Sequence, residues 1–105
     1  MKRRVGHAES NARIRGDILL YVRASGDIGA TLQFIAQVFL MVARDWAVDA
    51  LEENCGYLVD RGYLSQEHVR DDSSNIERWI YRLTTKGFEL LERTIPPDPE
   101  VSIVY

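Results

Sequence analysis

Apolar residues recur at helical spacing in the first quarter of the chain. Ile14, Ile18 and Val22 lie four positions apart, which predicts an amphipathic helix whose N-cap is Ser10 or Asn11. The glycine-containing stretch that follows is typical of a turn and ends this first helix.

The next segment would place apolar residues on more than one side of a helix. It predicts a second helix from about Thr31 to Arg44. Since a helix that is apolar on most sides is normally buried on most sides, either the other helices cover it or a partner subunit covers its second stripe. The first stripe comprises Leu32, Ile35, Phe39 and Val42, and the second comprises Phe34, Val38 and Met41.

A third helix is predicted from Asp49 to Arg61. Asp49 followed three residues later by Glu52 resembles a capping box, and Gly62 is placed to end the helix. We expect the side chains at i, i+4 and i+7 to face the core, which leaves the carboxylates between them in water. These core positions are Leu51, Cys55 and Leu58.

The last part of the chain predicts a β-hairpin and a short helix. Strands are predicted at Tyr63–Arg70 and Ile76–Leu83, and five turn residues join them. A helix capped by Thr84 or Thr85 then runs through Arg93, and three prolines give an extended tail. The predicted fold class is therefore α+β, mainly α. The predicted organisation is a flexible basic arm (1–9), a folded domain (10–94) and a proline-containing C-terminal tail (95–105).

The order of these elements resembles the winged-helix variant of the helix-turn-helix, in which the hairpin is the wing. Two motifs carry the resemblance. The first is the spacing of Leu51, Cys55 and Leu58 followed by Gly62, and the second is the Leu-Thr-x-x-Gly stretch within Arg82–Arg93. The resemblance covers the folded domain and implies three helices, a two-stranded wing and a C-terminal helix.

More narrowly, the chain resembles a group of small winged-helix proteins encoded by Mu-like phages and prophages. It shares with them the capped third helix, an aromatic residue before that helix's last leucine (Tyr57), the Leu-Thr-x-x-Gly stretch and the proline-containing tail. This resemblance implies a phage or prophage setting rather than a mechanism.

Charge is unevenly distributed along a chain whose net charge is −3. Residues 1–16 contain five basic residues and one acid, whereas residues 44–61 contain two basic residues and five acids. An acidic third helix is unfavourable for reading DNA, because its carboxylates approach phosphates without basic neighbours. The sequence therefore separates a basic N-terminus from an acidic middle.

One hypothesis is an accessory or transcriptional regulatory protein that holds double-stranded DNA through its basic arm and wing. The alternatives are that the arm is merely solvated, and that the wing arginines pair with Asp71, Asp72 and Glu77. The candidate DNA-contacting residues are Lys2, Arg3, Arg4, Arg13, Arg15, Arg70, Arg78 and Arg82.

The other hypothesis is a protein-interaction module, acting in phage replication, packaging or assembly, whose acidic third helix meets a basic phage or host protein. Trp46 in the turn is a candidate interface anchor. For Trp46 and Trp79 alike, packing between the wing and the helices is the commoner role. A homodimer through the second helix or the last three residues is also expected. The candidate interaction residues are Trp46, Glu52, Glu53, Tyr57 and Asp60.

Reactive side chains form no catalytic or metal-binding pattern. The single cysteine, Cys55, excludes an internal disulfide, and His7 and His68 are too few for a structural zinc site. No phosphate-binding glycine loop, signal peptide or apolar run long enough to span a bilayer is present in the sequence. We therefore expect a cytoplasmic protein that has no enzymatic activity, catalytic residue, metal or cofactor, and no membrane partner.

Overall fold

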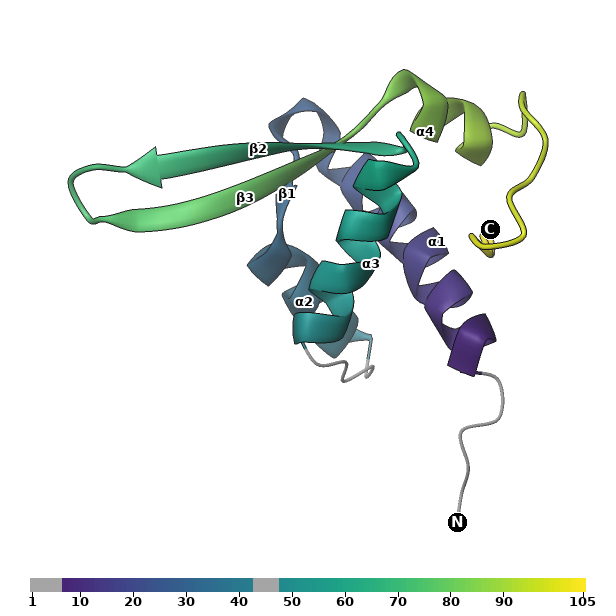
Figure 1. Cartoon of the computed structure of the whole chain (residues 1–105), viewed down its shortest axis with the longest axis horizontal. Helices are drawn as coiled ribbons and strands as arrows, with labels where there is room; N and C mark the ends of the chain where they lie inside the picture. The colour runs from purple at the N-terminus through teal and green to yellow at the C-terminus, as the bar shows by residue number, and fades with distance from the viewer. Residues whose placement is uncertain (1–6, 43–47) are drawn as a thin grey trace, which may run out of the picture.

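The computed structural model describes residues 7–42 and 48–105. In these ranges a body of helices carries a long β-hairpin that projects to one side (Figure 1). None of the described helices is long and apolar enough to cross a membrane. The elements are α1 (His7–Ser25), the 3-10 helix η1 (Gly26–Ile28), β1 (Ala30–Thr31), α2 (Leu32–Met41), α3 (Val48–Asp60), β2 (Leu64–Asp71), β3 (Ile76–Leu83) and α4 (Thr85–Leu91).

The core lies where α1, α2 and α3 meet the base of the hairpin. On α3 the predicted positions Leu51, Cys55 and Leu58 are fully buried, which confirms the spacing argument. The ring of Phe39 from α2 packs edge-on against Tyr21 of α1, with the ring centroids 5.1 Å apart. The other fully buried side chains are Ile14, Ile18, Leu19, Val22, Ile35, Leu64 and Leu91.

The second stripe of α2 is not covered by the rest of the described chain. Phe34 is half exposed and Met41 is 77% exposed, so the expectation that the neighbouring helices cover this stripe is wrong. Val42, predicted in the first stripe, is also about half exposed. A partner subunit on this face stays a prediction.

The predicted hairpin is confirmed, and a third strand joins it. β2 and β3 pair antiparallel in a register that sets Leu64 opposite Leu83 and Asp71 opposite Ile76. The two-residue strand β1 adds to the other edge of β3, in the order β1-β3-β2. Sequence reasoning missed β1, because two residues are too few to show an alternating pattern.

Several predicted helix ends shift. α1 begins at His7, so it extends into the segment predicted to be a flexible arm, and residues 1–6 lie outside the described residues. Asp49 lies in the first turn of α3 rather than at its cap. Thr84 caps α4, its hydroxyl accepting the Gly87 N–H at 3.0 Å, and the helix ends at Leu91, earlier than predicted.

The C-terminal tail folds back onto the body instead of extending away from it (Figure 1). Val101 is buried, and the N–H of Ser102 donates to the Ala12 carbonyl of α1 at 2.9 Å. Gly16 makes this approach possible, since a Cβ there would lie 1.9 Å from the Ser102 carbonyl oxygen. The tail is therefore part of the folded unit.

Candidate nucleic-acid interface

The wing presents two faces, because successive strand residues point to opposite sides. One face continues from the buried residues Leu64 and Tyr81 at the wing base outward to His68 and Trp79. Burial, and then the nearby Cys55 and Glu52, raise the pKa of Tyr81 to about 12, so at the wing base this face lies near α3.

Trp79 lies on this face and not in the core. It is 42% exposed, and its ring stacks on His68 with the ring centroids 4.5 Å apart. The expectation that Trp79 fills the gap between wing and helices is therefore wrong. Trp46 lies outside the described residues.

The three wing arginines differ in how firmly the molecule holds them. Arg82 donates to the Asp27 carbonyl at 3.0 Å and to a carboxylate oxygen of Glu67 at 2.6 Å, so it ties the wing base to η1. Arg70 donates to the Asn75 side chain at 2.9 Å at the wing tip. Arg78 is exposed and has no hydrogen-bond or ion-pair partner among the described residues.

Two of the acids expected to pair with these arginines, Asp71 and Glu77, contact other residues instead. Glu77 contacts His68, with Oε1 and Nε2 2.9 Å apart. Asp71 accepts the N–H and the hydroxyl of Ser73 within the turn, and these bonds hold its pKa below its ordinary value. The predicted pairing with Asp71, Asp72 and Glu77 is therefore wrong, and Glu67 takes that role for Arg82 alone.

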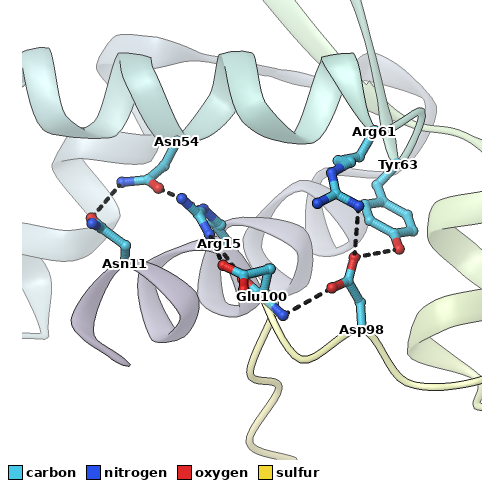
Figure 2. Close-up of polar contacts among 7 residues, drawn as sticks. All are labelled: Asn11, Arg15, Asn54, Arg61, Tyr63, Asp98 and Glu100. Atoms are coloured by element: carbon cyan, nitrogen blue, oxygen red, sulfur yellow. Dashed lines mark hydrogen bonds and ion pairs between the residues drawn. The ribbon is translucent and has the colours of Figure 1, made fainter. Parts of the chain in front are cut away.

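On α1, Arg13 and Arg15 have different surroundings. Arg13 is half exposed and pairs with Asp17 at 3.3 Å. Arg15 is held inside the molecule: its Nε donates to Asn54 at 2.9 Å, and its Nη1 donates to the Glu100 carbonyl at 3.1 Å (Figure 2). Arg15 therefore joins α1, α3 and the tail, and is not available to a phosphate. Lys2, Arg3 and Arg4 lie outside the described residues.

Asn54 is a buried polar residue that the sequence pattern did not single out. Its side-chain amide group donates to the Ala50 carbonyl at 2.9 Å. It also donates to the Asn11 side chain at 3.3 Å (Figure 2). Tyr57, a candidate interaction residue, packs its ring under the Arg15 guanidinium at 3.7 Å. Both residues therefore serve the α1–α3 contact.

The exposed side of α3 is acidic, as predicted. Its carboxylates, on Asp49, Glu52, Glu53 and Asp60, are exposed. No ion pair joins any of them to a described cation. This surface repels a phosphate backbone unless a cation from elsewhere intervenes.

Asp98 anchors the tail and was also missed by sequence reasoning, since it is an isolated acid between prolines. Its carboxylate accepts the Tyr63 hydroxyl at 2.7 Å and the Glu100 N–H at 2.8 Å, and Arg61 lies 4.0 Å away (Figure 2). Burial alone raises the pKa of Asp98, but these hydrogen bonds and the charges of Arg61 and Lys86 outweigh it, so the pKa lies below its ordinary value. Asp98 is therefore ionised at neutral pH.

Cys55 is a buried free thiol. Burial, and then the charge of Glu52, raise the pKa of the Cys55 thiol to about 12, so the reactive thiolate is scarce. The described residues contain no group of three or more His, Cys, Asp or Glu side chains that could hold a metal ion.

Comparison with solved structures gives the fold a counterpart. An X-ray structure described as a PadR-like transcription factor from bacteroid fragilis superposes with a TM-score of 0.75 and 21% sequence identity. The match covers 86% of this chain and 84% of that one. The fold is a winged helix. The scan of protein-family models and the search of curated proteins gave no match.

Proposed function

We propose that this chain is a DNA-binding accessory or regulatory protein of the phage or prophage type. It holds duplex DNA through phosphate contacts of the wing and the basic N-terminus, and acts in the cytoplasm. The observation that carries the proposal is Arg78, an exposed cation that has no partner among the described residues, on a wing that projects from the body (Figure 1). The similarity of the fold to that of a transcription factor supports the same role.

The charge distribution determines how such a protein binds. Because α3 presents Glu52 and Glu53, base reading by this helix is disfavoured, and affinity rests on backbone contacts. Arg78 and the more weakly held Arg70 supply the wing contacts, and Arg13 extends the basic segment onto α1. Arg15 and Arg82 are bonded within the molecule, so we do not include them among the proposed DNA contacts. Binding is therefore expected to be weak, sensitive to salt and tolerant of sequence.

The first test measures binding to a random duplex by fluorescence anisotropy at several salt concentrations. Replacing Arg78 with glutamine removes one phosphate contact, so the slope of log K against log salt should become shallower by about one unit. Deleting residues 1–4 should lower affinity for all sequences alike. Arg23→Gln serves as the matched control, because Arg23 is paired with Glu92 and is not one of the proposed contacts. No binding of the intact chain at low salt, or an unchanged slope for Arg78→Gln, would overturn the proposal.

A second candidate function is a protein-interaction module that uses α3. The supporting observation is a group of exposed carboxylates around Gly56 that form no ion pair with the cations in 7–42 and 48–105. Gly56 itself leaves open space where a side chain would be. Glycine in the interior of a helix costs about 1 kcal/mol relative to alanine, so a close approach by a partner is a physical reason to keep it there. The partner would be basic.

The double variant Glu52→Lys/Glu53→Lys separates the two functions. If α3 lies near DNA, the reversal raises DNA affinity and steepens the salt slope. If α3 receives a protein, DNA binding stays unchanged, while binding to a synthetic lysine- and arginine-rich peptide, followed by calorimetry, is lost. A peptide affinity equal to that of the unaltered chain would dismiss the second candidate.

A further inference from the structure

A half-open cavity of about 360 Å³ lies between α4 and the folded-back tail. Its volume falls within the range of small-molecule sites in proteins, about 300–1,000 Å³. The walls are mainly apolar, and the cavity is separate from both the wing and the acidic surface of α3. The residues that line it are Leu90, Arg93, Ile95, Pro97, Asp98, Val101, Ile103 and Tyr105.

Arg93 is held in an unusual backbone conformation at this cavity. It follows the end of α4 with φ 64°, in the left-handed region where glycine is normally found. The N–H groups of Arg93 and Thr94 donate to the Leu90 and Glu89 carbonyls, so a Schellman-type end closes the helix. A non-glycine residue in this conformation carries backbone strain. At Arg93 this conformation is combined with a guanidinium side chain that lines the cavity.

The guanidinium of Arg93 lies over an aromatic ring. Its Cζ lies 4.2 Å from the centroid of the Tyr105 ring, and the Tyr105 hydroxyl donates to the Leu91 carbonyl. No carboxylate of the described residues forms an ion pair with Arg93. An anion arriving at the cavity therefore has a cation to pair with.

Asp98, the other charged residue of the cavity, disfavours an anion at its own end. Its side chain is 9% exposed, and both carboxylate oxygens already accept hydrogen bonds, from Tyr63 and from Glu100. A ligand carboxylate is thus repelled near Asp98 and attracted near Arg93. The apolar side chains of Leu90, Ile95 and Ile103 also line the cavity, and they suit a hydrocarbon chain.

We propose that this cavity binds a medium-chain aliphatic carboxylate, with the chain against Ile95, Val101 and Ile103 and the carboxylate on Arg93. The inference is independent of DNA binding. Asp98 lines the cavity and accepts the Tyr63 hydroxyl at the base of the wing. A ligand in the cavity would therefore lie beside the residue that anchors the tail.

The test titrates the full chain with octanoate, octanol and octylamine, and follows backbone amides by NMR. Octanoate should bind with one-to-one stoichiometry and shift the amides of Leu90, Val101 and Ile103. Octanol and octylamine should bind at least about tenfold more weakly, because a hydrogen bond to a charged group is worth about 1.5 kcal/mol or more.

Arg93→Gly is the informative variant. Glycine relieves the left-handed backbone, so the variant should melt at the same temperature or higher, yet its affinity for octanoate should fall about tenfold. Arg93→Lys should keep most of the affinity, and Arg23→Gln should keep all of it. Tighter binding of octylamine than of octanoate, unchanged affinity in Arg93→Gly, or shifts confined to the exposed stripe of α2 would each overturn the proposal.

Discussion

Gly87→Ala is expected to destabilise the protein by about 2–3 kcal/mol, the upper part of the range of about 1–3 kcal/mol for overpacking a well-packed site. A Cβ at this position would lie 2.3 Å from the Tyr63 carbonyl oxygen and 2.8 Å from a methyl group of Leu83. The same carbonyl accepts the Thr84 N–H at 3.1 Å, so it cannot move without breaking the junction of wing and α4. Urea unfolding followed by circular dichroism measures the loss as a lower midpoint.

Gly56→Ala is the matched control. Gly56 is a helical glycine whose added Cβ meets nothing within 4 Å, so alanine there should stabilise the protein by about 0.5–1 kcal/mol. Two glycine-to-alanine changes are thus expected to have opposite signs. Equal effects of the two changes, or a stabilising effect of Gly87→Ala, would mean that α4 does not pack on Tyr63 as described.

This contact explains the Leu-Thr-x-x-Gly stretch in physical terms. Thr84 caps α4 through the Gly87 N–H and donates its own hydroxyl to the Gly62 carbonyl at 2.6 Å. Thr84 therefore joins the end of α3 to the start of α4. Gly87, which has no side chain, lets the Tyr63 carbonyl pack closely against α4. The motif is a junction between the wing and the helical body.

Much of the fold could be predicted from the sequence because its signals are local. The spacing of Leu51, Cys55 and Leu58 gave the buried face of α3, and β-forming residues flanking a turn gave the hairpin. The docked tail could not be predicted in this way. It depends on the approach of Ser102 to Gly16, between segments far apart in sequence that carry no shared periodicity.

For the candidate site, the sequence predicts where charged residues lie but not which of them are already paired. The sequence indicates that α3 is acidic and that the wing contains arginines, but not which arginines are already bonded. Arg15 meets Asn54 and Glu100, which lie 39 and 85 residues further along the chain. Glu67 and Arg82 meet diagonally across the hairpin, which requires the register to be known.

Asp98→Ala is expected to cost about 2–3 kcal/mol at pH 7, because it removes a nearly buried, ionised acceptor. The Tyr63 hydroxyl and the Glu100 N–H lose their partner, and Arg61 loses its ion pair with Asp98. Thermal unfolding should show a melting temperature lower by about 10 °C. Hydrogen exchange at the Ser102 amide, which bonds to the Ala12 carbonyl, should accelerate as the tail loosens.

The pH dependence of Asp98→Asn then distinguishes a charge effect from a packing effect. The pKa of Asp98 is below its ordinary value in the folded state, so its charge stabilises the fold fully above the unfolded-state value of about 3.9. That stabilisation is lost as the pH falls through the folded-state pKa, and the difference between Asp98→Asn and the unaltered chain should shrink below about pH 4. Tyr63→Phe, which removes one donor and leaves Asp98 ionised, should cost less, about 0.5–1.5 kcal/mol. A difference for Asp98→Asn that is constant from pH 7 to pH 2 would mean that shape, and not ionisation, holds the tail, because residue 98 titrates in the unaltered chain and not in the variant.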